Sequence, residues 1–365
     1  MAIVSDHWET IQVPLIRLVE DGVGEQLTER LKQLIYAIEI IRVEQFVAGP
    51  HYQFMGRKEM DRRSMARAFI AKAIYNQPTT ELLIEMLKHQ RVLRQICGFE
   101  RLNDVPSAST FSRAFAEFAQ MKLGDKVHEA LVRTHVGDQI VMHVSRDSTE
   151  VQAREKPAKK ETPAPQPKRK RGRPKKGEEL APKEPKRIEK QLTQTLEEAI
   201  AELPQVCDIG SKSNSKGHKH SWAGWKAHID YAGGSIPLSV ITTSASLHDS
   251  QTAIPLARMT ARRVTSCYDL MDSAYDAAPI RKISEELGHV AIIDANKRRS
   301  RKIPMEPDRA RRYKDRSAAE RGNSRLKDEF GLRHLRVRGH AKAHMHIMFG
   351  ILALFADQLM NVMSG

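Results

Sequence analysis

One segment of the 365-residue chain cannot belong to a folded core, and it divides the sequence in two. Residues 156–190 hold 14 Lys and Arg, 5 Asp and Glu, 7 prolines and no aromatic residue. Such a segment has too little apolar surface to offset the entropy lost on folding, so we expect it to be disordered alone. The fold must be built from the residues on either side, with this segment as an insertion.

The basic balance of the whole chain limits its partners. Sixty Lys and Arg against 45 Asp and Glu give a net charge of +15, of which residues 156–190 supply +9. This favours a polyanion, and nucleic acid ahead of a membrane surface. The start, MAIVSDHWETIQ, shows no secretory signal, and the longest apolar run, IMFGILALFADQLM, is too short to span a bilayer and contains Asp357. We expect that run to be a buried helix, with no membrane partner.

Cysteine and histidine usage gives little sign of zinc or disulfides. The three cysteines are scattered and odd in number, which fits a reducing compartment. Histidines cluster at 218–220 and 340–346, and a pair spaced like His340 and His344 can bind zinc. No cysteine or acid stands at suitable spacing, so packing or DNA-facing roles are favoured.

Residues 1 to about 135 are expected to be mostly helical. Two apolar stripes recur at helical spacing and are predicted to face a core. Their members are Leu82, Leu83, Met86 and Leu87, and then Phe111, Phe115 and Phe118. The polar residues around the second stripe could face DNA or water.

A different pattern follows. QIVMHVSRDSTEV is typical of a strand that ends at Asp147, after which the insertion leaves. RIEKQLTQTLEEAIAEL is expected to be helical, and WKAHIDY and IPLSVITT flank AGGS as a hairpin. SQTAIPLARMTARR and PIRKISEELG are expected to be helices, and CYDLMDS and HVAIIDAN strands. Hairpin strands combined with crossover helices predict an α/β fold, a mixed sheet with helices on its faces.

The segment RRYKDRSAAERGNSRLKDEF carries a polar stripe. At about 100° per residue, Tyr313, Arg316, Glu320 and Lys327 fall within roughly 60° of one helix face. A carboxylate there suits a metal, and its cationic neighbours suit phosphate. The alternative is a solvated face with an Arg316–Glu320 pair worth only a few tenths of a kcal/mol.

Three acids stand where a site would form. Asp147 and Asp272 follow strands, and Glu320 lies on the helix after the last strand. Converging carboxylates repel one another unless a divalent cation lies between them, and Mg²⁺ suits hard oxygen ligands. Asp269 and Asp276 are rivals for the middle position, and spacing alone leaves open that the acids are unrelated.

These motifs carry a family resemblance. Asp147 in VSRDST, Asp272 in MDSAYD and the Y-x2-R-x3-E-x6-K stripe resemble the DDE transposases of bacterial insertion sequences, with the signature of the insertion-sequence four and five lineage. The stretch 222–250, with its His-Asp run, resembles their second and third strands, and roughly 61–121 resembles the helical domain before the catalytic one. The pair Ser273–Ala274 departs from the family's usual basic-glycine pair.

The resemblance implies an organisation and a chemistry. Residues 1–135 would form a helical DNA-binding or dimerisation domain, 136–155 and 206–365 an RNase H-like catalytic domain, and 156–205 the basic insertion. Asp147, Asp272 and Glu320 would be the catalytic residues and the ligands of Mg²⁺ or Mn²⁺. Tyr313, Arg316 and Lys327 would contact double-stranded DNA, held by a homodimer. The protein would be cytoplasmic and associated with the bacterial nucleoid. Only 27 positions separate Ile293 from Glu320, so a DNA hairpin intermediate stays open.

The insertion contains its own motif. Arg171, Gly172, Arg173 and Pro174 resemble an AT-hook, in which two arginines lie along a narrow A·T minor groove. A plain polybasic tether is the alternative. The leading hypothesis is a transposase. The other hypotheses are a domesticated relative acting as a nuclease, and a non-catalytic A·T-rich DNA-binding protein.

Overall fold

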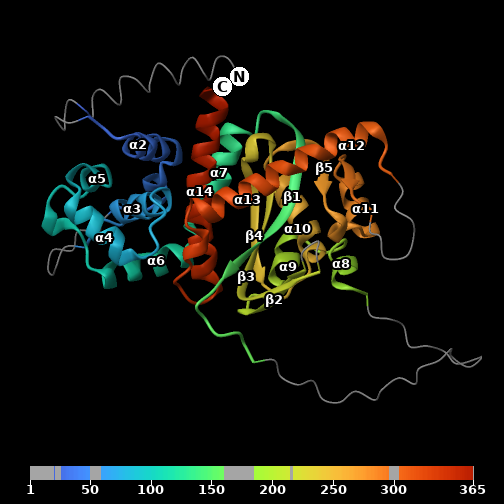
Figure 1. Ribbon diagram of the computed structural model, residues 1–365, viewed down its shortest axis with the longest axis horizontal. Helices are drawn as coiled ribbons and strands as arrows, with labels where there is room; N and C mark the ends of the chain where they lie inside the picture. The colour runs from blue at the N-terminus through green and yellow to red at the C-terminus, as the bar shows by residue number, and fades with distance from the viewer. Residues whose placement is uncertain are drawn as a thin grey trace, which may run out of the picture.

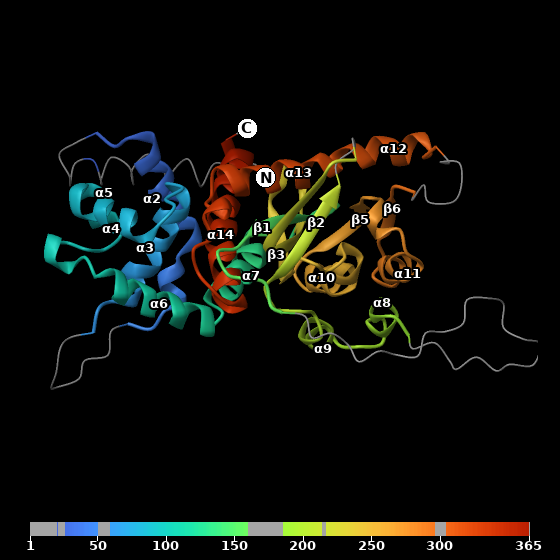
Figure 2. The ribbon, with the colours of Figure 1, turned by 60° about the horizontal axis from the view of Figure 1, so that its bottom comes forward.

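The computed structural model describes residues 20, 26–49, 59–159, 185–213, 217–295 and 304–364. A group of N-terminal helices lies at one end of the molecule and a six-stranded sheet at the other (Figure 1). The long C-terminal helix stands between them, and both views show helices on either face of the sheet (Figure 2). The AT-hook-like residues 171–174 lie outside the described residues.

The helical expectation for the N-terminal part is confirmed where it is described. Its elements are α2 (Glu29–Ile41), η1 (Val43–Phe46), α3 (Arg62–Ile74), α4 (Thr80–His89), α5 (Arg91–Ile96), η2 (Leu102–Asp104), α6 (Ala108–Gln120) and α7 (Leu123–His135). The side chains of Thr28, Asp61 and Thr79 cap the first turns of α2, α3 and α4 by accepting a backbone N–H.

The two expected apolar stripes differ in burial. All three phenylalanines of α6 are buried, and their rings pack around Phe69 of α3. On α4, Leu83 and Leu87 are buried, whereas Leu82 is exposed and Met86 only partly covered. The predicted stripe was therefore too wide, because one side of α4 faces solvent.

The C-terminal helix α14 (His340–Ser364) is the core helix of the molecule. It packs against α2, α3, α6 and α7, and also against the sheet through β4. The sequence predicts that the run IMFGILALFADQLM is too short to span a bilayer. The whole helix His340–Met363 is long and apolar enough to cross a membrane, which corrects that prediction. However, 78% of an 18-residue apolar stretch within it is buried inside the protein, as expected for a helix that is apolar on all sides because it lies in a core.

The sheet is mixed, as predicted. Its strands are β1 (Ile140–Gln152), β2 (Asp208–Ser213), β3 (Lys219–Tyr231), β4 (Pro237–Ser244), β5 (Thr265–Met271) and β6 (Val290–Ile293). The order is β2-β3-β1-β5-β6, and β4 also pairs with β3. β1 runs antiparallel to β3 and parallel to β5, and β5 runs parallel to β6.

Helices and short turns lie between these strands and, from α12 on, between β6 and α14. They are α8 (Arg187–Lys190), α9 (Leu196–Ala201), η3 (Gly233–Ser235), η4 (Asp249–Thr252), α10 (Ala253–Ala261), η5 (Ser273–Tyr275), α11 (Ala278–Glu286), α12 (Pro307–Tyr313), η6 (Lys314–Arg316), α13 (Ser317–Asp328) and η7 (Leu332–His334). The hairpin around AGGS and the helices at 253–261 and 278–286 confirm the sequence predictions.

Three expectations about the sheet region need correction. β1 does not end at Asp147: it continues to Gln152, because residues 145–152 pair with β3. The insertion therefore leaves the sheet later than expected. The strand β2, which pairs with the first half of β3, was not anticipated. The helical segment expected at 187–203 is two short helices, α8 and α9, separated by a turn.

The helix that carries the polar stripe is not one uniform α-helix. A 3₁₀ turn, η6, separates α12 from α13. The sheet holds this turn in place, since Asp315 accepts a hydrogen bond from the Ser145 hydroxyl at its carbonyl and lies 2.8 Å from His143 through its carboxylate. A tighter turn changes the angular spacing of the residues on either side of it. The single 60° stripe is thus broken between Tyr313 and Glu320.

Candidate active site

The register of two neighbouring strands brings the first two acids together. In the parallel pair β1–β5, Ser145 lies opposite Leu270, the last pair before the strands separate. Asp147 and Asp272 each follow two residues later, so they emerge side by side on one face of the sheet. β1 continues to Gln152, but its neighbour β5 ends just before Asp272. Asp147 therefore lies at the end of β5, where a site can form. Asp272 caps the following turn by accepting the Ala274 N–H at 2.9 Å.

Strand alternation removes the rivals for the middle acid. Asp269 is an odd number of residues from Asp272 and therefore points to the opposite face of β5. It is buried there, where it accepts the Ser284 hydroxyl at 2.7 Å and lies 3.3 Å from His289. Asp276 lies beyond the strand and pairs with Arg281 at 2.8 Å.

The helix α13 crosses the face of the sheet that carries Asp147, and specific contacts set its position. The Ser235 hydroxyl donates to the Ala318 carbonyl at 2.7 Å. The side chains of Ala319 and Leu326, on the inner face of α13, are buried. At Gly322 the helix touches Tyr231 of β3: a Cβ there would stand 2.4 Å from the tyrosine ring. A glycine is therefore required for this close approach.

Asn323 connects the helix to the first acid. Its amide donates to Asp147 Oδ2 at 3.0 Å, and its carbonyl oxygen accepts the Tyr231 hydroxyl at 3.0 Å. The side chain is buried, so both bonds form away from solvent. Glu320 lies three residues earlier, on the same side of the helix. The helix that carries the third acid is thereby fixed against Asp147.

Glu320 is turned toward a cation in this structure. It is exposed and forms an ion pair with Arg316. Throughout the described ranges, no three Asp, Glu, His or Cys side chains are grouped closely enough to hold a metal ion as they stand. The structure brings Asp147 and Asp272 together and leaves Glu320 at the edge of the site, paired with the arginine.

The electrostatics of the site reflect an excess of negative charge. Burial raises the pKa of Asp147 to about 6; the charge of Asp272 pushes the same way, while the Ser148 N–H, Lys212 and Arg316 oppose them. Burial alone would lower the pKa of Arg316, yet Tyr313, Glu320, Asp147 and Asp272 together raise it. Arg316 thus lies among all three acids and partly balances them.

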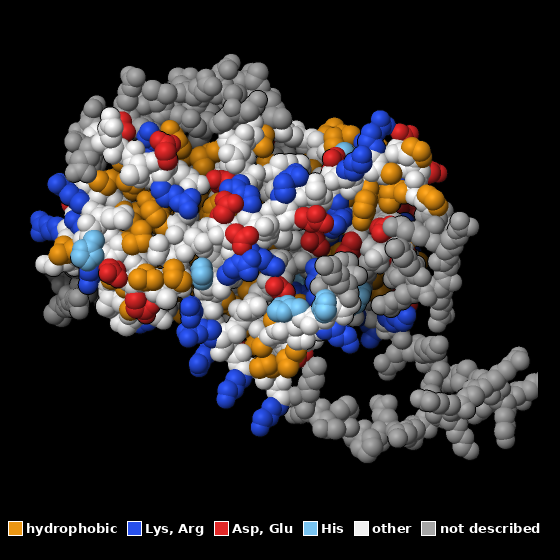
Figure 3. All heavy atoms as spheres, viewed as in Figure 1, with side chains coloured by type: hydrophobic (Ala, Val, Ile, Leu, Met, Phe, Trp, Pro, Cys, Tyr) orange, Lys and Arg blue, Asp and Glu red, His pale blue; other side chains and the backbone are white. Residues whose placement is uncertain are grey.

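The other predicted contact residues are spread along the same helix. Arg316 lies over the ring of Tyr313, 5.8 Å from its centre. Burial raises the pKa of Tyr313, which keeps its phenol protonated. Lys327 lies seven residues after Glu320, about 10 Å along the helix at 1.5 Å per residue, and 3.7 Å from Glu150. Acidic and basic side chains are interspersed on this side of the molecule (Figure 3).

The histidines of α14 are packing residues, as favoured from the sequence. His344 bridges the Thr242 hydroxyl and the Asp125 carboxylate, at 2.8 and 2.9 Å. His340 and His346 each bond a backbone carbonyl, those of Thr242 and Gly331.

Sequence reasoning missed two polar residues beside the acids. Asn323 was visible only as a polar residue one turn after Glu320. Tyr275 is fully buried, and its hydroxyl has no hydrogen-bond partner among the described residues. Burial raises its pKa, and the charges of Asp249, Asp147 and Asp272 raise it further, so the hydroxyl lies near the acidic site.

Comparison with protein families agrees with this geometry. Residues 142–356, more than half of the chain, match the family described as Transposase DDE domain. The chain belongs to the DDE transposases. Residues 24–117 match a second family, described as Transposase domain (DUF772). No curated protein and no solved structure gives a significant match.

The family membership explains the architecture. The protein is a transposase in which a helical N-terminal region precedes an RNase H-like mixed sheet flanked by helices. It is an enzyme of phosphoryl transfer.

Proposed function

We propose that this transposase cleaves the ends of a mobile DNA element and joins them to target DNA, using Asp147, Asp272 and Glu320 as its catalytic carboxylates. One observation supports this most directly. The β1–β5 register and the Asn323–Asp147 hydrogen bond place two acids from adjacent strands beside the helix that carries the third. The Y-R-E-K spacing supports placement in the insertion-sequence four and five lineage.

The donor set fits a divalent cation. All three groups offer hard carboxylate oxygens, and burial together with the charge of Asp272 disfavours the ionised form of Asp147, which a bound cation would stabilise. Glu320 is exposed, so its side chain can turn from Arg316 toward the other two acids. When bound, Mg²⁺ (or Mn²⁺) would supply the activation of a water or hydroxyl nucleophile and the stabilisation of the leaving oxygen.

The protein's own residues then have distinct tasks. Asn323 fixes the orientation of Asp147 by donating to one carboxylate oxygen. Arg316 is the local counter-charge of the acids and would move to a DNA phosphate when Glu320 is released, since a guanidinium pairs well with either group. Tyr313, kept protonated, can donate to a second phosphate oxygen, and Lys327 can contact the backbone further along α13.

The experiment is cleavage of labelled duplex carrying the inverted repeats that flank the coding region. Cleavage should require Mg²⁺ or Mn²⁺ and stop in EDTA. Asp147→Ala, Asp272→Ala and Glu320→Gln should each abolish it. Asp308→Asn, an exposed acid of α12 that pairs with Arg311, is the matched control and should retain it. Cleavage that survives in EDTA, or in all three variants, would refute the assignment.

Two further expectations belong to this proposal. Arg171, Gly172, Arg173 and Pro174 would hold A·T-rich DNA near the active site. An Arg171→Ala/Arg173→Ala variant should then lose affinity for A·T-rich more than for G·C-rich duplex, whereas equal loss would indicate a plain tether. Transposition brings two ends together, so light scattering should detect a homodimer on end DNA.

A further inference from the structure

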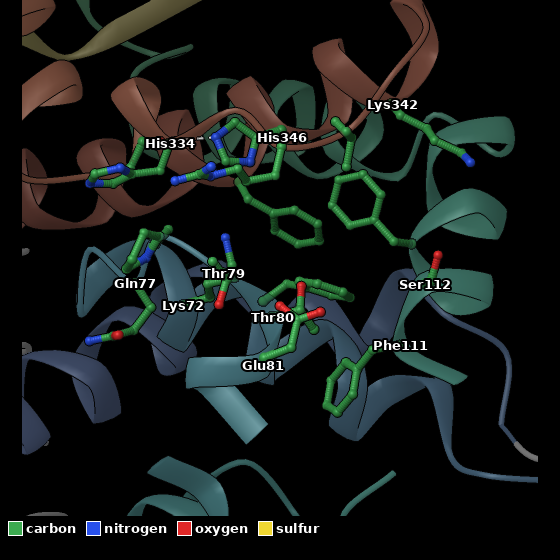
Figure 4. Close-up of a pocket in the computed structure, with 18 of the residues that line it drawn as sticks. Lys72, Gln77, Thr79, Thr80, Glu81, Phe111, Ser112, His334, Lys342 and His346 are labelled. Atoms are coloured by element: carbon green, nitrogen blue, oxygen red, sulfur yellow. Dashed lines mark hydrogen bonds between the residues drawn. The ribbon is translucent and has the colours of Figure 1, made fainter. Parts of the chain in front are cut away.

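A cavity of about 510 Å³ lies between the N-terminal helices and the C-terminal part of the chain. One wall comes from the end of α3 and the start of α4, with Lys72, Thr80 and Glu81 (Figure 4). The facing wall comes from η7 and α14, with His334 and His346 (Figure 4). Its volume is in the range of ligand sites.

The charge of this cavity is one-sided. Its described lining residues include a single carboxylate, Glu81, and five cations: Lys72, Arg154, Arg336, Arg338 and Lys342. No ion pair or hydrogen bond forms at the side chain of any of these five among the described residues. Elsewhere the arginines are largely paired, as Arg316 is with Glu320 and Arg325 with Glu329 and Asp357. Cations without counter-charges around a cavity repel one another, and a bound anion would reduce this repulsion.

The titratable groups respond to this field. Burial lowers the pKa of Lys72 to about 8; Glu81 opposes the shift, and Arg336 adds to it. Burial also lowers the pKa of His334, and Lys72, Arg336 and Arg333 lower it further. The cations of the two walls therefore act on one another across the cavity.

The position of the cavity relates it to the proposed active site. Phe330 and Gly331, immediately after α13, line it, and Glu320 is ten residues before Phe330. Because α13 ends at Asp328, about 12 Å of helix at 1.5 Å per residue separates Glu320 from the edge of the cavity, which corresponds to three or four base-pair steps of about 3.4 Å along the axis of a DNA duplex. Lys327 lies between the two. DNA whose phosphate is at Glu320 and whose backbone follows α13 would arrive at this cavity.

We propose that the cavity is a second DNA contact, in which Lys72, Arg336, Arg338 and Lys342 hold backbone phosphates roughly three to four nucleotides from the phosphate that reacts. This rests on the proposed function for the position of the DNA. The required ligand chemistry is a phosphate group, which DNA backbone and a free nucleotide share. The continuity with α13 favours the backbone.

The test compares two charge-matched triple variants of the full chain. Arg336→Gln/Arg338→Gln/Lys342→Gln removes three cavity cations that are exposed or partly exposed. Lys190→Gln/Arg262→Gln/Lys282→Gln removes three exposed cations from α8, the end of α10 and α11, outside both the cavity and the N-terminal helices. Binding to a fluorescein-labelled random-sequence duplex is measured by anisotropy in EDTA over a range of salt.

The cavity variant should reduce the slope of log affinity against log salt by about 2 to 3, because each lost phosphate contact removes about 0.9. Lys72→Gln alone should reduce it by about 0.9. The control variant should leave the slope unchanged. Equal effects of both triples, or no effect of the cavity variant, would overturn the proposal. Thermal unfolding verifies that each variant folds, and the exposed triple keeps the test valid if Lys72→Gln is unstable.

A second arm distinguishes the two sources of phosphate. Calorimetry with dAMP should show no binding. Saturable dAMP binding that the cavity variant abolishes, with an unchanged DNA salt slope, would make the cavity a nucleotide site and overturn the backbone proposal. Because binding is measured without metal, a protein that shows the expected slopes but never cleaves would refute the proposed function alone.

Discussion

Adjacent residues of β1, Arg146 and Asp147, face opposite sides of the sheet and meet opposite electrostatic conditions. On one side, Arg146 donates two hydrogen bonds to Asp230, both of 2.8 Å, and Thr260 donates to the same carboxylate at 2.7 Å. All of these side chains are buried. On the other side, Asp147 accepts a hydrogen bond from an uncharged donor, Asn323, and its neighbours carry both signs of charge: the acid Asp272 and the cations Lys212 and Arg316.

The difference separates a structural network from a reactive one. The Arg146–Asp230 pair is closed, since its charges balance and its hydrogen bonds are made within the protein. On the Asp147 side, burial and the charge of Asp272 raise the pKa of the carboxyl to about 6, while the Ser148 N–H and the cations Lys212 and Arg316 offset this only in part. Buried charges cost free energy unless they are paired, so acids that are only partly compensated at a strand end support the cation site proposed above.

Matched Asp→Asn substitutions on the two sides give the sharpest test. Asp147→Asn should lower the DNA cleavage rate by about 10³-fold or more, because an amide is a poor replacement for a metal-binding carboxylate. It should not destabilise the metal-free protein, since it removes a charge that burial and Asp272 disfavour. Thermal unfolding with increasing MgCl₂ should raise the midpoint of the wild type but not of the variant. Normal cleavage by Asp147→Asn, or its unfolding in EDTA, would show that Asp147 has a structural role like that of Asp230 and would contradict the comparison.

The same change on the other face should act on stability. Asp230→Asn leaves buried Arg146 without its hydrogen-bonded counter-charge, with Asp269 as the remaining acid acting on it, and breaking a buried pair in this way costs about 3–5 kcal/mol of unfolding free energy. Urea denaturation would measure it. At a temperature where the variant is still folded, the cleavage rate should stay within a few-fold of wild type. Loss of activity in a fully folded Asp230→Asn protein would show that this face also takes part in catalysis.

The contact between α13 and the sheet connects the two faces. Gly→Ala in a helix usually stabilises by about 1 kcal/mol, but at Gly322 the new methyl would collide with Tyr231. We expect Gly322→Ala to destabilise by about 1–3 kcal/mol and to move Glu320 from the acids, with a loss of cleavage near 10²-fold. Gly331→Ala, just beyond the helix, is unsuitable as a control because its φ is +82°. Ser324→Ala, exposed on α13, should leave both quantities unchanged.

Sequence reasoning succeeded where the signal was local. The α6 phenylalanines, the hairpin around AGGS and the β5 and β6 strands follow from periodicity and turn residues within a few positions. It failed where contacts between segments far apart in the sequence determine the secondary structure. β1 continues past Asp147 because it pairs with residues 224–231, and the DIGSKS strand forms against β3 without an alternating pattern. The η6 turn depends on Ser145 and His143 of β1. The two main walls of the cavity come from residues 69–115 and 330–349, more than 200 positions apart, so no short sequence motif predicts it.

Buried histidines away from both faces should respond to acid. His128 lies within bonding distance of the Pro237 carbonyl at Nε2, 2.9 Å, and of the Arg263 guanidinium at Nδ1, 3.2 Å. The carbonyl requires a proton on Nε2 and the arginine an unprotonated Nδ1, so the neutral ring fits. Burial, followed by the charge of Arg263, lowers its pKa to about 3.

The sign follows from proton binding: between pH 6.5 and 3 the unfolded chain binds the proton and the folded protein does not, so stability falls as pH falls. His128 alone should cost about 2 kcal/mol between pH 7 and pH 5. His128→Gln, which can keep the bond to the Pro237 carbonyl, should reduce the acid-dependent loss by that amount, whereas His220→Gln at an exposed position should not. Urea denaturation at pH 7 and pH 5 measures the loss of unfolding free energy. If His128→Gln and the wild type lose the same amount, groups other than His128 cause the loss.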